Sequence, residues 1–230
     1  MRRGPAIALS ALLIAATPTV LVGNALWVLV NPWLVHAQYA IPGFPDDDQG
    51  LEGDERSDLA VTGIRSVRPW DDGIVLLEEA RLPEGEPAFD ERETTHMQDV
   101  RDLIGGFLVA WAIALVAAIG AGLALWRFGE RARLQAALLW GAKLTIGVMA
   151  ISALLLLVSF ETFFDGFHGI FFEGDSWRFN ETYTLRRLYP DFFWGSAGAI
   201  TALVIGLQAA GVFAAARRLG PPRGRLGHHR

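Results

Sequence analysis

The sequence has no cysteine, and this absence excludes several chemistries at once. Among its 230 residues there is no thiol that could form a disulfide, bind a metal as thiolate or act as a nucleophile. Any catalysis therefore has to use histidine, carboxylate, hydroxyl or arginine side chains.

Charge is almost missing from four long stretches of the chain. Residues 5–30, 103–126, 138–160 and 195–216 are apolar throughout, except for Lys143. A helix of about 20 apolar residues crosses the ~30 Å hydrocarbon core of a bilayer. The sequence therefore predicts an all-α integral membrane protein, a four-transmembrane-helix bundle.

The remaining segments differ sharply in charge. If the N-terminus, residues 127–137, Lys143 and the tail lie inside, that side carries 11 basic residues and one acid. The other side then has 9 basic residues and 24 acids. Basic residues are retained in the cytoplasm, so both termini are expected there. Nothing in this pattern suggests a nucleic-acid partner.

These patterns divide the chain into eight parts. We expect spans at 1–30, 103–126, 138–160 and 195–216, a cytoplasmic turn at 127–137 and a basic cytoplasmic tail at 217–230. An acidic extracytoplasmic cap covers 31–102, and an aromatic extracytoplasmic loop covers 161–194. An alternative for the first span is a secretory signal with a cleavage site at Val35-His36-Ala37, although the apolar run is longer than a usual signal core.

The cap is expected to be small and mixed in structure. Apolar residues at helical spacing predict one short surface helix over 55–67, ended by Pro69. Residues 74–77 and 87–89 flank a Pro83/Gly85 turn and suggest a hairpin. From Asp90 onward the residues favour a helix that enters the second span without a break.

Two segments pair a histidine with an aspartate three residues away, and both lie just outside a span on the same side. The first holds His96 and Asp99, and the second holds Asp165 and His168. On a helix such a pair shares a face, so each carboxylate could orient its imidazole. The alternative is that each histidine is an ordinary interfacial residue.

The same four side chains could also hold a metal, because two imidazoles and two carboxylates suit zinc, iron or manganese. No dense metal-ligand motif accompanies them, so we predict no metal and no cofactor. Arg186 and Arg187 lie in the aromatic loop, and residues 160–194 contain nine of the fourteen phenylalanines. They could bind an anionic group or pair with Glu181 or Asp191.

Two stretches carry a family resemblance. Residues 89–100 resemble the F-x-x-R-E-x-x-H-x-x-D-V signature of a bacterial four-span membrane family, long known as a domain of unknown function, DUF1461. Residues 167–172, Trp177 and 189–193 resemble its second signature. This chain departs from the family at residues 180–184, where a D-P-x-T-D stretch is common.

That family includes the lipoprotein intramolecular transacylase, and the resemblance implies a corresponding activity. It implies transfer of an acyl chain from the glyceryl ester to the α-amino group of a lipoprotein's N-terminal diacylglyceryl cysteine, at the outer face of the bacterial cytoplasmic membrane. Membrane lipids and diacylglyceryl lipoproteins would be its partners. The family's essential histidines correspond to His96 and His168.

From the residue patterns and the family resemblance we expect one set of catalytic residues and one set of substrate-binding residues. One histidine would act as base and the other as acid or electrophile, oriented by Asp99 and Asp165; Arg92, Trp177, Arg186 and Arg187 would bind substrate. The sequence leaves two other functions open. One is a metal-dependent membrane hydrolase using the same cluster, and the other is a non-enzymatic accessory protein.

Overall fold

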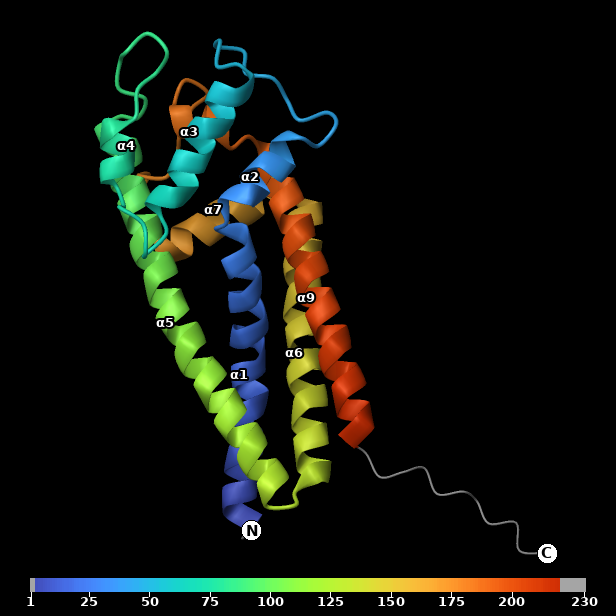
Figure 1. Ribbon diagram of the computed structural model, residues 1–230. Coiled ribbons are helices and arrows are strands. Elements are labelled where there is room, and N and C mark those ends of the chain that lie inside the picture. The colour runs from blue at the N-terminus through green and yellow to red at the C-terminus, as the bar shows by residue number, and fades with distance from the viewer. Residues whose placement is uncertain (1–2, 220–230) are drawn as a thin grey trace, which may run out of the picture. The chain divides into compact units, whose positions relative to one another are not determined.

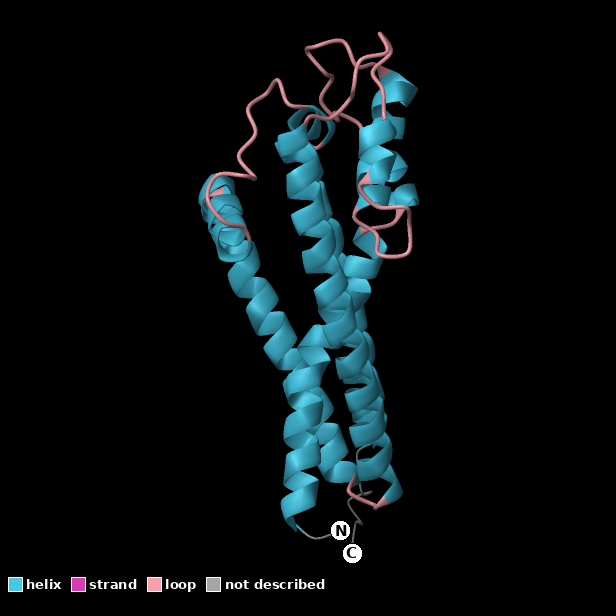
Figure 2. Ribbon diagram, turned by 90° about the vertical axis from the view of Figure 1, so that its left-hand side faces the viewer, coloured by secondary structure: helices cyan, strands magenta, loops and turns pink. Residues whose placement is uncertain are grey.

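The computed structural model describes residues 3–219, and in that range every regular element is a helix (Figures 1 and 2). The helices are α1 (Arg3–Leu29), α2 (Pro32–Tyr39), α3 (Gly53–Ser66), α4 (Val75–Glu79), α5 (Glu91–Arg127), α6 (Arg131–Val158), α7 (Phe160–Phe171), α8 (Thr184–Leu188) and α9 (Asp191–Leu219). Most of the predicted basic tail at 217–230 lies outside the described residues.

Four helices are long and apolar enough to cross a membrane: α1, α5, α6 and α9. Each has at least 27 residues, which at 1.5 Å per residue exceeds the ~30 Å hydrocarbon core. Large apolar side chains on them, such as Val116 and Leu203, are exposed. This confirms the prediction of an all-α multi-pass membrane protein.

Contacts divide the chain into two compact units. The first contains residues up to 22, residues 110–151 and residues from 204 onward. Its buried core joins α1, α5 and α6 through small and aliphatic residues: Ala6, Leu13, Ala121, Leu125, Leu134 and Ala137. Between α5 and α6 the connection is short, because Gly129 adopts a positive φ of 77° that ends α5. Helix α6 therefore begins at Arg131, before the apolar run at 138.

The second unit comprises residues 23–109 and 152–203 and contains the cap. Its core gathers aliphatic and aromatic residues from α2, α3, α4, α8 and the adjoining turns of α5 and α9, including Val35, Leu59, Leu77, Met97, Leu188 and Tyr189. Helix α3 confirms the surface helix predicted at 55–67. Helix α2 was not predicted; Asn31 caps it and Pro32 occupies its first turn.

The predicted hairpin at 74–89 is wrong. Residues Val75–Glu79 form α4, and the segment retains a single antiparallel bridge between Arg81 and Pro87. Leu77 is buried in the cap core, with α4 packed against α3. This packing overrides the strand preference of the local sequence.

Helix α5 starts with reciprocal hydrogen bonds between Asp90 and Glu93. The Glu93 backbone N–H donates to the Asp90 side chain at 2.8 Å, and the Asp90 N–H donates to the Glu93 carboxylate at 3.0 Å. This is a capping box, which fixes the first turn. The helix then runs to Arg127, as predicted for an unbroken entry into the second span.

Candidate active site

His96 lies in the second turn of α5, seven residues before the apolar run. Its side chain is buried, with 7% exposed, among the rings of Phe172 and Phe179 at 5.0 and 5.4 Å between centroids. The Nδ1 atom is buried and has no hydrogen-bond partner among residues 3–219. An imidazole nitrogen in this state costs free energy unless something binds to it, so the position indicates function as much as packing.

His168 lies near the end of α7, and its ring centroid is 6.2 Å from that of His96. Its Nδ1 is 2.8 Å from the backbone carbonyl oxygen of Phe164. A carbonyl can only accept, so Nδ1 carries the hydrogen and Nε2 has the free lone pair. His168 is thereby set up to accept a proton at Nε2.

Ser159 separates α7 from α6 because it forms the N-cap of α7. Ser159 adopts an extended backbone, and its hydroxyl accepts a hydrogen bond from the Thr162 N–H at 3.2 Å. The chain therefore starts a new helix directly after the third span. This turn of direction brings His168, which is 72 residues from His96 in the sequence, to the first histidine.

Burial lowers the pKa of His168 below its usual range. The hydrogen bond to Phe164 and the charge of Asp165 act in the opposite direction but do not compensate. An imidazole with an ordinary pKa near 6.5 is already mostly neutral at pH 7, so the lowered pKa of His168 keeps it neutral there. A neutral imidazole can act as a base.

Trp177 packs against the imidazole of His168. Its indole ring stacks on the imidazole at 4.9 Å between centroids, with an angle of 29° between planes. Only 5% of Trp177 is exposed, and its Nε1–H has no acceptor in the part of the chain that the structure describes. Among the described residues, the neighbours of His168 thus include two buried nitrogens without a partner, one on His96 and one on Trp177.

The two aspartates do not orient the histidines as predicted. Asp165 forms an ion pair with Arg178 at 2.9 Å, while His168 Nδ1 is bonded to a backbone carbonyl. Asp99 is exposed, and no hydrogen bond joins it to His96 within residues 3–219. Sharing a helix face does not bring either carboxylate to its histidine, because Asp99 is directed toward water and Asp165 toward Arg178.

Arg92 supports the segment that holds Trp177. Its guanidinium donates to the carbonyl oxygens of Asp175 and Arg178 and lies over the rings of Phe179 and Tyr183. Both hydrogen bonds come from Nη2 of the guanidinium that was predicted to bind substrate. Arg92 therefore positions the loop after α7.

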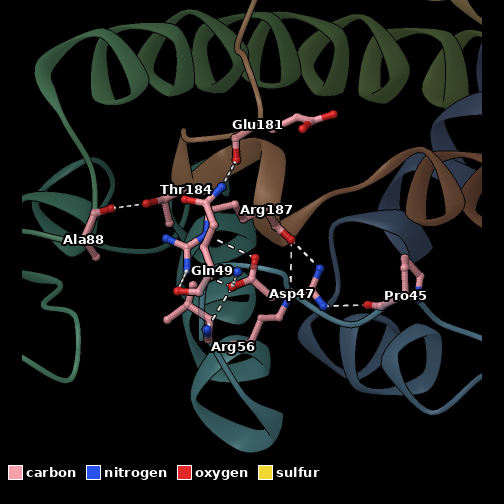
Figure 3. Close-up of polar contacts among 9 residues, drawn as sticks. Pro45, Asp47, Gln49, Arg56, Ala88, Glu181, Thr184 and Arg187 are labelled. Carbon is pink, nitrogen blue, oxygen red and sulfur yellow. Dashed lines mark hydrogen bonds and ion pairs between the residues drawn. The ribbon is translucent and has the colours of Figure 1, made fainter.

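The other two arginines form ion pairs. Arg186 pairs with Asp191, which is one of the two partners considered from the sequence. Arg187 instead makes a two-point contact with Asp47, at 3.1 and 2.8 Å (Figure 3). Both guanidinium groups are engaged by carboxylates, so an anionic group of the substrate would compete with these ion pairs.

Figure 3 shows how the Arg187–Asp47 pair fastens the aromatic loop to the cap. Arg56 donates to the carbonyl oxygens of Pro45 and Arg187, and Thr184 donates to that of Ala88 at 2.5 Å. These contacts therefore anchor the aromatic loop, which carries Trp177, to two parts of the cap: the segment with Asp47 and Arg56, and Ala88. A rigid anchor of this kind holds the rings of the site in place.

Sequence reasoning missed the aromatic lining of the histidine pair. Phe164, Phe172 and Phe179 all contact one or both imidazoles. The signal was the concentration of phenylalanine in residues 160–194, which indicated packing without identifying partners. Within residues 3–219 no group of three or more histidine, aspartate and glutamate side chains converges as a metal site.

Comparison with known proteins identifies the family of this chain. Residues 74–194 match the family model described as lipoprotein intramolecular transacylase Lit. An uncharacterised protein of Aquifex aeolicus (strain VF5) is 28% identical over 196 residues, covering 85% of this chain and 87% of its own.

The fold is similar to that of the membrane integral transacylase Lit from Bacillus cereus. That structure has a TM-score of 0.77 at 19% identity, with 93% of this chain and 95% of the other covered. A variant of the same protein with a histidine replaced by arginine gives 0.75, covering 93% and 91%. Since the matching family model spans more than half of the 230 residues, the chain belongs to the lipoprotein intramolecular transacylase (Lit) family of membrane enzymes.

Proposed function

We propose that this enzyme moves an acyl chain from the glyceryl ester to the α-amino group of a lipoprotein's N-terminal diacylglyceryl cysteine. The product is a lyso-form lipoprotein with an amide-linked chain. The observation that carries the proposal is the buried pair of His96 and His168, whose rings lie 6.2 Å apart. In this reaction the substrate provides its own nucleophile, so the enzyme needs only proton transfer and charge stabilisation.

His168 acts as the base. The amine nitrogen attacks the ester carbonyl carbon while Nε2 of His168, the nitrogen with the free lone pair, takes the amine proton. When the bond between the acyl carbon and the glyceryl oxygen breaks, His168 returns this proton to the departing oxygen. One proton thus moves from nitrogen to oxygen, and the enzyme ends in its starting state.

His96 acts as the electrophile. Its buried unpartnered nitrogen is Nδ1, which as Nδ1–H donates a hydrogen bond to the carbonyl oxygen as negative charge develops. Trp177 Nε1–H, a donor with no acceptor beside His168, provides a second such bond. Substrate binding then satisfies groups that are unpaired in the free enzyme.

The charge asymmetry supports the bacterial cytoplasmic membrane as the location, with both termini in the cytoplasm and the histidines at the outer face. Diacylglyceryl lipoproteins and membrane lipids are the partners at that face. The acyl chains of such substrates lie in the same leaflet as the ends of α5 and α6 next to the site.

Mass spectrometry of a reporter lipoprotein's N-terminal lipopeptide tests the function. The host lacks other N-acylating enzymes and carries the wild-type chain, His96→Gln, His168→Gln or the control His36→Gln. His36 is exposed and contacts Ser57, away from the site. Wild type and the control should give the lyso-form, and both site variants should lose it.

An unchanged diacyl lipopeptide with correctly inserted wild-type protein would refute transacylation. Loss of an acyl chain without a new amide would instead indicate hydrolysis. Full turnover in either site variant would refute the histidine pair as the catalytic unit.

A further inference from the structure

Helix α7 differs from the other helices of the second unit because one of its faces is not covered by protein. It follows the third span after Ser159 alone, and it runs across the direction of the last turns of α6 (Figure 1). None of its residues is fully buried. The uncovered face of α7 is therefore in contact with something other than this protein.

The residues of α7 separate cleanly around the helix axis. At about 100° per residue, its six large apolar side chains fall within an arc of roughly 120°. They are Phe160, Phe163, Phe164, Phe167, Ile170 and Phe171. Glu161 and Asp165 lie on the opposite side, and His168 lies at the boundary between the two.

The uncovered part of this arc is strongly apolar. Ile170 has 76% of its side chain exposed, and Phe167 and Phe171 are also exposed. Leu157 and Val158, at the end of α6, are exposed as well. Because α7 follows the membrane span α6 after Ser159 alone, lipid is the occupant that its exposed apolar face meets there.

The first end of α7 lies at the edge of the apolar layer, and its last turn lies within about 10 Å of that edge along α5. Its first residue follows the apolar end of α6, and its last turn packs beside His96 through Phe172. His96 is seven residues before the apolar run of α5, a rise of about 10 Å. A helix held at this level, with one apolar and one acidic side, has the geometry of an interfacial helix.

We propose that the exposed apolar face of α7 lies in the membrane interface and binds the acyl chains of the lipid-anchored substrate beside His168. The first half of this proposal concerns the depth of the helix, and only the second half rests on the transacylation proposed above. The boundary position of His168 places its imidazole where ester groups of lipids meet their acyl chains. Helix α7 thus joins chain binding and proton transfer in one element.

The absence of cysteine makes the depth directly measurable. Ile170→Cys and Glu161→Cys are each labelled with a nitroxide in nanodiscs of phosphatidylethanolamine and phosphatidylglycerol. The two positions lie on opposite sides of the same helix, about 180° apart. We expect the label at 170 to collide more with oxygen, which concentrates in lipid, and the label at 161 to collide more with a water-soluble nickel chelate.

Preferential collision of both labels with the nickel chelate would overturn the interfacial position of α7. This result does not depend on whether the enzyme transfers acyl chains. If the wild type made no lyso-form lipopeptide while the label at 170 remained in lipid, the proposed transacylation would be refuted. The interfacial position of α7 would still be supported.

Acyl-chain contact is tested by kinetics on a diacylglyceryl lipopeptide in the same nanodiscs. Ile170→Glu should lower kcat/KM by about tenfold or more, since a charge replaces apolar surface that the chain covers. Ile170→Leu and the polar-side control Glu161→Gln should stay close to wild type. An Ile170→Glu enzyme with unchanged kcat/KM would refute chain binding by this face.

Discussion

The indole of Trp177 stacks on the imidazole of His168, with 4.9 Å between ring centroids and 29° between ring planes. Two functions of the indole can be separated experimentally, because the ring packs and the Nε1–H is an unpaired donor. Arg178 lies over the outer side of the same indole at 4.9 Å, so the ring is held from two directions.

Trp177→Phe should keep most of the stacking and lose the donor. If Nε1–H binds the developing oxyanion, kcat should fall on the order of 10²–10³, the usual effect of removing one such donor. KM should change little, since the bond strengthens only in the transition state. Single-turnover kinetics measures this, and a Phe variant with wild-type kcat would leave the indole with a packing role only.

The pH dependence of kcat/KM should show two ionisations, one below neutrality and one slightly above it. The substrate amine, with a pKa near 8, must be neutral to attack, and His168 must be neutral to accept the proton. The logarithm of kcat/KM should therefore rise with slope about two at low pH. Above the lowered pKa of His168 the slope should become about one, until the amine is deprotonated.

Asp165→Asn should move the lower break to more acidic pH. Burial is the largest cause of the lowered pKa of His168, and the charge of Asp165 opposes it, so removing that charge lowers the pKa further. The release of Arg178 from its ion pair acts in the same direction. A break that moved toward neutral pH would contradict the base assignment.

The Arg187–Asp47 pair should matter far more for stability than the Arg186–Asp191 pair. The first is almost covered, with 10% and 4% of the side chains exposed, and the second is open. Asp47→Asn leaves a covered guanidinium unpaired, at a cost of about 3–5 kcal/mol, whereas Asp191→Asn should cost about 1 kcal/mol or less. Hydrogen exchange of the cap peptides measures both, and equal effects would be contrary to expectation.

Acid should weaken the same contact. Burial raises the pKa of Asp47, but hydrogen bonds from Arg187 and the Leu51 N–H, with the charge of Arg56, outweigh it and leave the pKa lowered. The stabilisation is therefore present above the unfolded-state pKa near 3.9 and is lost as the pH falls through the lowered value. Cap exchange should accelerate there in the wild type but not in Asp47→Asn.

Gly141 is required by a close approach of two helices. A Cβ at this position of α6 would lie 2.6 Å from the Cβ and Oγ1 of Thr17 in α1. Gly141→Ala should lower the Tm in detergent, and adding Thr17→Gly should restore part of the loss. Gly147→Ala on the same helix is the control, because a Cβ there meets nothing within 4 Å.

The membrane class was predictable because it depends on the chain's own composition. An uncharged apolar run of about 20 residues has few alternatives to a spanning helix, and all four such runs form one. The cap was less predictable, since the strand-like residues before Leu77 become a helix through contact with α3. Local preference in a short segment is easily overridden in this way.

The site was predictable in its histidines but not in their surroundings. His96 and His168 were expected to meet because each lies just outside a span on the same side. The aspartates were wrong because spacing gives the face of a helix, not the direction of a short side chain. The tautomer of His168 depends on a backbone carbonyl one turn earlier, which the residue types do not encode.

The carboxylate of Glu93 links the two halves of the site through backbone groups alone. One oxygen accepts from the Asp90 N–H at the start of α5, and the other accepts from the Leu185 N–H at 2.7 Å in the aromatic loop. Losing it would displace His96 and the loop of Trp177 together. A mutational scan that records only activity would therefore rank Glu93 with the histidines, although its role is to keep two distant segments in register.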